Sequence, residues 1–156
     1  MVVLKSFSPI VGRRTKILIL GCMPGVKSLE AAECYARAQN QFWKKMGRLL
    51  FFAPSLANKK RVKTLLDNKV GLWDVVKSCR RQGSLDSNIK HVVFNDIHRL
   101  LSGYKEIMAI LCNGQKAYQL LTKHFKDNNT PVVVLPSASP VYVKPFEWKL
   151  TKWQVI

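Results

Sequence analysis

The sequence has few acidic residues and no long apolar run. Asp and Glu number 9 against 26 Lys and Arg, which gives a formal charge of +17. No stretch approaches the roughly 18 apolar residues of a membrane span, and the first residues lack the apolar region of a signal peptide. We therefore expect an intracellular protein without a membrane segment. The basic excess favours a polyanionic partner, nucleic acid first, although it could also serve only to keep the protein soluble.

Cofactor and metal signatures are also lacking. The residues from 21 to 28, GCMPGVKS, place Val26 where a Walker A loop needs glycine, and no G-x-G-x-x-G occurs. The three histidines show no metal-ligand spacing, and no C-x-x-C pair is present. We predict no organic cofactor, no metal and no disulfide. Each of the four cysteines is expected to be a small, buried or half-buried hydrophobic residue, and a reactive thiol is the alternative: Cys22, Cys34, Cys79 and Cys112.

Length and patterning predict one α/β domain over residues 1–156. No internal repeat, low-complexity tract or Gly/Ser linker interrupts the chain. Continuous apolar runs, typical of strands buried on both faces of a parallel sheet, cover 16–20, 70–76, 106–112 and 131–135. Helical patterns cover 42–52, 95–101, 114–125 and 146–153. Strands that alternate with helices indicate an α/β sandwich.

Local signals refine these elements. In the helix at 42–52 the apolar spacing places Lys44, Lys45 and Arg48 outside the core. Asn95 is expected to cap the helix that ends at Leu101, and Ser28 the helix that follows the turn at 21–25. Ligands of such sheets bind beyond the carboxyl ends of the strands, so the functional site is expected in the segments after residues 20, 76, 112 and 135.

Six blocks of sequence in this order resemble a known family. GCMPG (21–25) and YARAQNQFW (35–43) are similar to the uracil-DNA glycosylase superfamily, whose mismatch-specific members carry GxNPG-type and FAHPxNRFW-type segments. GLWDV (71–75), CRRQGSLDSNI (79–89), NGQKA (113–117) and LPSASP (135–140) resemble the hypoxanthine-DNA (deoxyinosine) glycosylase branch. The matches run from about residue 16 to the C-terminus.

The resemblance implies a pocket that holds a base flipped out of the DNA stack. Tyr35 matches the aromatic residue that stacks on this base, and simple packing at a helix end is its alternative role. Met23 stands where the mismatch-specific relatives carry a water-activating side chain, and the branch uses the residue that is Asn40 here. Asn40 is expected to position a water molecule or to bind an edge of the base, and Asn113 to form a supporting hydrogen bond to Asn40, to the water or to the base. The base pocket is expected to include Gly21, Cys22, Met23, Pro24 and Tyr35.

Each of these residues also has a purely structural alternative role. Asn40 could cap the helix that begins at Phe42 while it faces the pocket, and Asn113 could belong to an ordinary Asn-Gly turn. Ser84, Asp86 and Ser87 are interpreted as caps and turn formers without a catalytic role.

DNA contacts are expected from a loop and from a basic block. The resemblance places Ser137, Ser139 and Pro140 in a loop that enters the minor groove and contacts phosphates, and an ordinary Pro-containing loop is the alternative. The segment between Glu33 and Asp67 contains no acidic residue and eight basic ones: Arg37, Lys44, Lys45, Arg48, Lys59, Lys60, Arg61 and Lys63. Of these, Arg37, Lys44 and Lys45 are the predicted DNA-binding residues. A solvated basic surface is the alternative for each.

The sequence thus predicts a monomeric, monofunctional DNA glycosylase that releases hypoxanthine first and uracil second. The expected fold is a three-layer α/β/α sandwich with a short, mostly parallel, four-stranded sheet. Arg37 and Ala38 replace the family's His and Pro, and Met23 is apolar, which motivates a rival: a catalytically inactive, basic DNA-binding module. Bulky Val141, Tyr142 and Val143 affect access of the lesion. A weaker alternative is an α/β hydrolase of small nucleotides.

Overall fold

Four parallel strands form the central sheet of the computed structural model, which describes residues 2–127 and 129–156. In the order of the sheet they are β3 (Val70–Asp74), β2 (Ile17–Gly21), β6 (Ala109–Asn113) and β7 (Val132–Leu135). The register pairs Gly21 with Asp74 and Asn113 with Leu135, so the four strands end at one edge. The predicted four-stranded parallel sheet is confirmed.

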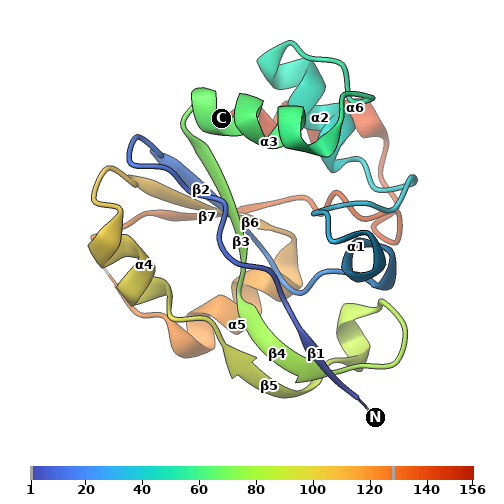
Figure 1. The fold of residues 1–156 in the computed structure, drawn as a ribbon, viewed down its shortest axis with the longest axis vertical. Helices are drawn as coiled ribbons and strands as arrows, with labels where there is room; N and C mark the ends of the chain where they lie inside the picture. The colour runs from blue at the N-terminus through green and yellow to red at the C-terminus, as the bar shows by residue number, and fades with distance from the viewer. Residues whose placement is uncertain (1, 128) are drawn as a thin grey trace.

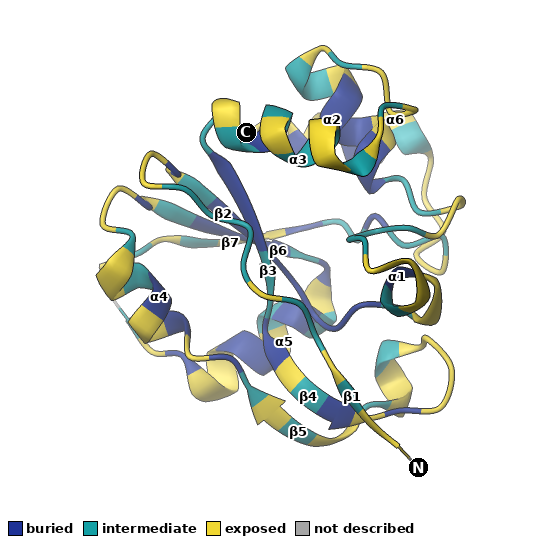
Figure 2. Cartoon of the chain, in the orientation of Figure 1, coloured by how far each residue is buried: buried dark blue, intermediate teal, exposed yellow. Residues whose placement is uncertain are grey.

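The side chains of β2 point alternately into two cores, one on each face of the sheet. Leu18 and Leu20 belong to one core and Ile19 to the other. The first core is covered by α4 (Ile97–Gly103) and α5 (Gln115–His124), and the second by α2 (Phe42–Leu50), α3 (Asn58–Asp67) and α6 (Phe146–Trp153). Figure 1 shows these two groups of helices, and Figure 2 shows that their buried sides face the sheet. The three-layer sandwich is confirmed.

A second, antiparallel sheet was not predicted. It consists of β1 (Val3–Lys5), β4 (Val76–Arg80) and β5 (Lys90–Phe94), with β4 in the middle. Its apolar side chains pack against the core beneath α4 and α5. The segment between β4 and β5 carries the short helix η1 (Asp86–Asn88) and, together with α1 (Val26–Ala31), lies beside the open edge of the central sheet (Figure 1).

Two predicted strands have different bounds. The apolar run at 70–76 breaks at Val75, because the chain leaves β3 there and enters β4 of the second sheet. The run at 106–112 becomes a strand only at Ala109, since its first residues form a turn and the approach to the sheet. Sequence patterning alone does not mark either boundary, because the apolar character continues through both.

The helix α3 was also not predicted, because its lysines and arginine mask a weak apolar face. That face consists of Val62 and Leu65, which pack in the core beneath α2 and α6. With 10 residues each, α3 and α5 are both short. No helix in the described ranges has the length and apolar character needed to cross a membrane.

The prediction that Asn95 caps α4 is wrong. The cap is its neighbour Asp96, whose Oδ1 accepts a hydrogen bond from the backbone N–H of Arg99 at 3.0 Å. Asn95 is buried instead, and its Nδ2 donates to the carbonyl oxygen of Asp74 at 2.7 Å. Because Asp74 ends β3, this bond fixes the backbone at the bend between the two sheets.

The cysteines behave as small core residues. Cys22, Cys79 and Cys112 are buried free thiols and Cys34 is a half-buried one, which confirms the prediction for all four. Burial raises the pKa of Cys34 and of Cys112 to about 12. Both thiols therefore stay protonated and are poor nucleophiles at neutral pH.

Lys45 is buried, which corrects its predicted position on the outer, DNA-binding face of α2. Its neighbours Lys44 and Arg48 are exposed, but the exposed fraction of Lys45 is 0%. The Lys45 Nζ lies 4.8 Å from the ring centroid of Trp153 and is without a hydrogen-bond partner among the described residues. Burial, and to a smaller extent the charge of Lys149, lowers the pKa of Lys45 to about 7.

We expect the substitution Lys45→Met to raise the free energy of unfolding at pH 7 by roughly 1–3 kcal/mol, because Met fills similar space without a desolvated amine. The wild-type amine binds fewer protons in the folded than in the unfolded state between about pH 7 and 10.5, the ordinary pKa of a lysine side chain. Wild-type stability should therefore rise with pH across that window, and the variant should lack this rise. Urea unfolding at two pH values measures both effects.

The control is Lys44→Met, the same change at the exposed neighbour on the same helix. We expect it to alter the free energy of unfolding by no more than about 0.5 kcal/mol. Equal effects of the two substitutions would contradict the assignment of a destabilising, buried amine.

Candidate active site

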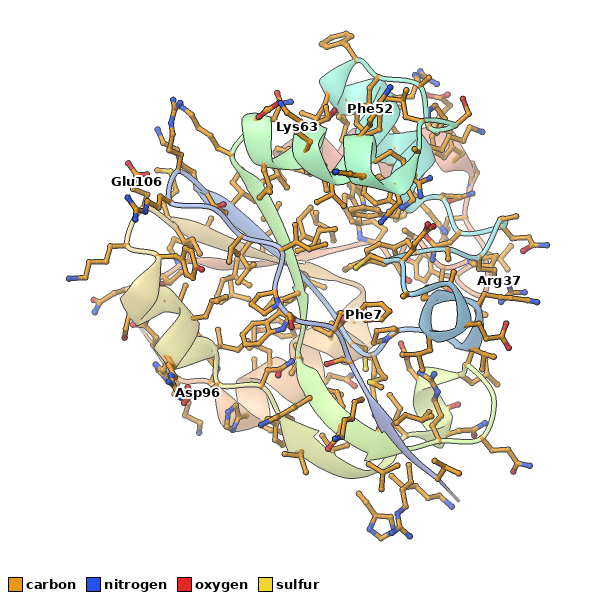
Figure 3. The ribbon with its side chains drawn as sticks, viewed as in Figure 1. Phe7, Arg37, Phe52, Lys63, Asp96 and Glu106 are labelled. Atoms are coloured by element: carbon orange, nitrogen blue, oxygen red, sulfur yellow. The ribbon has the colours of Figure 1, made fainter. Side chains whose placement is uncertain are left out.

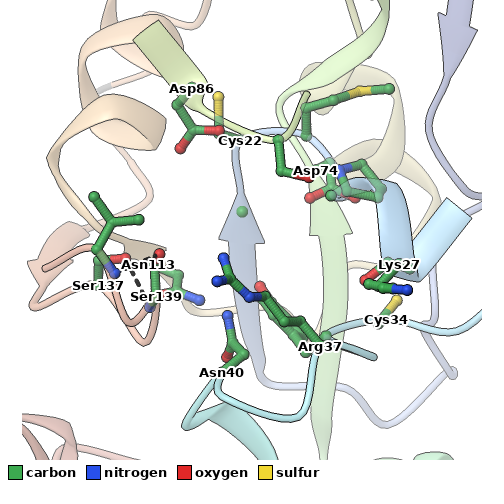
Figure 4. A pocket seen from close by; sticks show the side chains of 18 of the residues that line it. Cys22, Lys27, Cys34, Arg37, Asn40, Asp74, Asp86, Asn113, Ser137 and Ser139 are labelled. Carbon is green, nitrogen blue, oxygen red and sulfur yellow. Dashed lines mark hydrogen bonds between the residues drawn. The ribbon is translucent and has the colours of Figure 1, made fainter. Parts of the chain in front are cut away.

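A pocket of about 440 Å³ opens at the edge where the parallel strands end. Gly21, Asp74 and Asn113 are the last residues of β2, β3 and β6, and all three line it. Figure 4 shows this arrangement from close by. The geometry agrees with the expectation that the site lies beyond the carboxyl ends of the strands.

The ring of Tyr35 forms an aromatic wall of the pocket. It stacks on Phe42, with ring centroids 4.0 Å apart and an interplanar angle of 24°. Phe42 in turn meets Trp153 edge to face at 6.0 Å. The indole N–H of Trp43 donates to the carbonyl oxygen of Cys34 at 2.9 Å and so holds the backbone beside Tyr35. The wall is thus continuous with the core beneath α2 and α6.

Gly21 leaves room for two polar groups at the end of β2. A Cβ at this position would lie 2.7 Å from Asp74 Oδ1 and 3.0 Å from the Tyr35 hydroxyl oxygen. A side chain at residue 21 would therefore displace the carboxylate, the hydroxyl or both. The absence of a side chain at Gly21 allows both groups to approach the floor of the pocket.

Ser28 does not cap α1, because it lies inside the helix and Gly25 occupies the N-cap position. Its Oγ accepts a hydrogen bond from the backbone N–H of Ala36 at 3.0 Å instead. This bond connects α1 to the segment that carries Tyr35. The predicted cap is therefore wrong, and the serine fixes the pocket wall.

Asn40 and Asn113 each use the side-chain oxygen to bind the backbone. Asn40 Oδ1 accepts from the N–H of Phe42 at 2.9 Å, so it supports the first residue of α2 from the position before the N-cap. Asn113 Oδ1 accepts from the N–H of Ala138 at 2.9 Å. What remains for a ligand is the donor Nδ2 of each amide, and Figure 4 shows that of Asn40 pointing into the pocket.

The loop after β7 is held by its own serines. Ser137 Oγ accepts from the N–H of Ser139 at 3.1 Å, and Ser139 Oγ accepts from the N–H of Val141 at 3.2 Å. Lys149 Nζ donates to the Ser139 carbonyl oxygen at 3.2 Å. Val141 and Tyr142 also line the pocket, and Val141 is 61% exposed. Apolar side chains therefore stand at the entrance.

The structure brings most of the predicted site residues together. Lys44 and Lys45 are outside the pocket, the first exposed on α2 and the second buried. The predicted residues that do line it are Gly21, Cys22, Met23, Pro24, Tyr35, Arg37, Asn40, Asn113, Ser137, Ser139 and Pro140.

Two carboxylates of the pocket were missed by the sequence interpretation. Asp74 lay inside the predicted strand at 70–76, and Asp86 was assigned to a turn. Burial, and next the charge of Asp86, raises the pKa of Asp74 to about 7, while Arg81 opposes the shift. Burial also raises the pKa of Asp86, which Arg81, a hydrogen bond from Cys22 and Lys116 oppose. Across residues 2–127 and 129–156, no group of three acidic, His or Cys side chains could hold a metal ion.

Arg81 was also missed, and it connects two loops of the pocket. Its Nη2 donates to the carbonyl oxygen of Pro24 and its Nε to that of Gly83, both at 2.7 Å. The side chain is buried, so these charge-assisted bonds hold the turn at 21–25 against the segment after β4. No sequence signal separates Arg81 from the exposed Arg80 beside it.

Half of the basic block is engaged within the protein. Arg48, Arg61 and Lys63 form ion pairs with Glu147, Glu33 and Asp67, and Lys45 is buried. In the part of the chain that the structure describes, four basic residues of the block are exposed and take part in no ion pair: Arg37, Lys44, Lys59 and Lys60. Figure 3 shows Arg37 extending outward near α1, at the entrance of the pocket.

Comparisons with known proteins identify relatives along nearly the whole chain. A family model of the uracil DNA glycosylase superfamily matches residues 9–155. A protein of Methanosarcina acetivorans named hypoxanthine DNA glycosylase is 31% identical over 97% of this chain and 96% of its own. A protein of the same name from Methanosarcina barkeri is 33% identical over 72% of each chain.

A solved structure has the same fold. The solution NMR structure of a Methanosarcina acetivorans protein, provisionally named a uracil DNA glycosylase, superposes with a TM-score of 0.84. The identity is 30%, and the alignment covers 99% of this chain and 96% of that one. Together with the arrangement of the pocket, these matches show that the chain belongs to the uracil DNA glycosylase superfamily.

Proposed function

We propose that this chain is a monofunctional DNA glycosylase, which hydrolyses the N-glycosidic bond of a deaminated base, hypoxanthine first and uracil second. The observation that carries the proposal is the pocket itself. It combines the aromatic ring of Tyr35 with the side-chain amides of Asn40 and Asn113, and the basic Arg37 lies at its entrance. The relatives named hypoxanthine DNA glycosylase support hypoxanthine as the preferred base. The protein acts as an intracellular monomer.

The pocket suits a flipped base because it combines an aromatic face with fixed donors. Tyr35 offers one face of its ring while Phe42 holds the other, so a base stacks without movement of the wall. Asn113 binds the loop at Ala138 through its oxygen. It therefore supports this loop rather than acting on the base alone.

Asn40 acts on the departing base. When the bond between C1′ and the base nitrogen breaks, the sugar becomes oxocarbenium-like and negative charge develops on the base. The Asn40 Nδ2 donates a hydrogen bond to this charge, and its fixed orientation means that little reorganisation is needed. Met23 at the neighbouring turn has no group that could take the same role.

DNA is bound at the entrance. Arg37 contacts a phosphate beside the flipped nucleotide, and Lys44 adds positive charge farther along α2. The loop with Ser137, Ser139 and Pro140 approaches the duplex from the other side of the pocket. The hydroxyl oxygens of both serines already accept backbone bonds, so they offer mainly O–H donors to phosphate.

The first test is base release by Asn40→Ala. We expect the rate of hypoxanthine release from a deoxyinosine duplex to fall by about 10²–10³-fold, because one donor to the developing charge is lost. Labelled duplex is incubated with the protein and treated with alkali, which cuts at each abasic site. Monofunctional action predicts that no strand break precedes the alkali.

The control is Gln119→Ala, which also removes a side-chain amide, because Gln119 is exposed on α5 outside the pocket. It should keep the wild-type rate within about twofold. An unchanged rate in Asn40→Ala counts against the proposed mechanism. Tight binding of deoxyinosine duplex by the wild type without any base release would instead establish the inactive DNA-binding module.

Arg37→Gln tests the phosphate contact. Removal of one phosphate contact should lower the steepness of log K against log[salt] by about 0.9. Fluorescence anisotropy with an uncleaved duplex at several salt concentrations measures this slope. Lys105→Gln is the control, since Lys105 is exposed beside Glu106, which Figure 3 shows on the opposite side of the molecule from Arg37. Equal slopes for wild type and Arg37→Gln would exclude the contact.

A further inference from the structure

The polar side chains of the pocket are largely bound to the backbone. Each of six oxygen atoms accepts a hydrogen bond from a main-chain N–H, at distances between 2.8 and 3.2 Å. Amide and hydroxyl oxygens are also weak bases. These groups therefore hold the walls in place and are poorly suited to take a proton. The six atoms belong to Ser28, Asn40, Ser84, Asn113, Ser137 and Ser139.

Asp74 differs from all of these residues. Its main-chain oxygen accepts from Asn95, but its carboxylate forms no hydrogen bond or ion pair within the described ranges. The side chain lies against Gly21 and lines the pocket. Figure 4 shows Asp74 across the pocket from Asn40. An unpaired, half-buried carboxylate in a chain of charge +17 requires an explanation.

Asp86, the other carboxylate of the pocket, also forms no ion pair among the described residues, but more groups favour its ionised form. The charge of Arg81, the neighbouring Cys22 thiol and the charge of Lys116 all oppose the rise of its pKa. Arg81 is itself fixed by the carbonyl oxygens of Pro24 and Gly83. For Asp74 only the charge of Arg81 opposes the rise of its pKa, and its carboxylate lies against Gly21 at the end of β3, so Asp74 is the better proton acceptor of the two.

We propose that the Asp74 carboxylate accepts a proton from the water that attacks the sugar, which makes Asp74 a catalytic residue. This inference rests on the proposed glycosylase function. The water oxygen forms a bond to C1′ while the bond from C1′ to the base breaks, and the electron pair of that bond leaves with the base. The proton of the water passes to Asp74 and then, directly or through solvent, to the base. The net reaction adds OH to C1′ and H to the base.

The surroundings of Asp74 favour this role. A general base works best when its pKa is near the working pH, and burial together with the charge of Asp86 raises the pKa of Asp74. The other groups that face it are the Arg81 guanidinium, which opposes the shift, and the protonated Tyr35 hydroxyl and Cys34 thiol. Once ionised, the carboxylate also stabilises the positive charge of the oxocarbenium-like sugar.

The test is the pH dependence of single-turnover hypoxanthine release from a deoxyinosine duplex. For the wild type we expect the rate to rise about tenfold per pH unit below a midpoint near 7 and to level off above it. Asp74→Asn keeps the shape of the side chain but removes the base. It should lower the rate at high pH by about 10²–10⁴-fold and flatten the profile, while duplex affinity changes little.

Asp86→Asn is the matched comparison, because it makes the same change in the same pocket. It removes a charge that raises the pKa of Asp74, so the profile should remain pH-dependent with its midpoint shifted to lower pH. In Asp74→Ala, added formate should restore part of the rate by replacing the lost carboxylate. If Asp74 had only a structural role, the pH midpoint would not shift in Asp86→Asn, and formate would not restore the rate of Asp74→Ala.

Several outcomes would overturn the inference. A wild-type profile that is flat between about pH 5.5 and 8.5 does so without any variant. If Asp74→Asn keeps the rate and the pH profile of the wild type, the inference is wrong but the glycosylase function stands. A defect confined to duplex affinity or to the choice of base would assign Asp74 to base recognition instead. Absence of base release by the wild type at every pH overturns the proposed function, and this inference with it.

Discussion

The parallel register between β2 and its two neighbours determines where the strand-end residues of the site lie. The strands β3, β2 and β6 end at Asp74, Gly21 and Asn113, so residues distant in the chain meet at one edge. A shift of one residue in any strand would turn the terminal side chain to the opposite face. The alternation of Leu18, Ile19 and Leu20 between two closed cores opposes such a shift.

Backbone amides then fix the chemistry of the pocket. Because Asn40 and Asn113 accept bonds from main-chain N–H groups, each amide presents only its donor side to a ligand. The hydrogen-bond donors are therefore Asn40 in the loop before α2 and Asn113 at the end of β6, and the free acceptor is the Asp74 carboxylate at the end of β3. The wall, the donors and the acceptor therefore all depend on the same sheet edge.

Continuous apolar runs made the central sheet predictable, since strands buried on both faces need them. The same signal concealed Asp74, because the run at 70–76 continues past the end of β3 and the residue lay inside the predicted strand. The cap of α4 shifted by one residue because Asn95 and Asp96 are equally good cap residues in sequence. Only the three-dimensional fold shows which of the two is buried.

Residues of the site were predictable where a motif carried them, as at Tyr35 and Asn40. Lys45 was not, because a charged residue on a helix is exposed in most proteins and its burial against Trp153 depends on the packing of α6. Arg81 was not either, because its partners are carbonyl oxygens, which any sequence supplies. Contacts of side chains with the backbone leave little trace in the pattern of residues.

The aromatic contacts from Trp153 through Phe42 to Tyr35 have a thermodynamic consequence. The Tyr35 ring is clamped against Phe42, so its rotational entropy is lost when the protein folds and not when a base arrives. Val141 at the entrance is instead 61% exposed, so its side chain keeps rotational freedom after folding. The Tyr35 wall is therefore preorganised for its ligand. Exposed side chains at the entrance lose conformational entropy only when the duplex binds, and this loss opposes association.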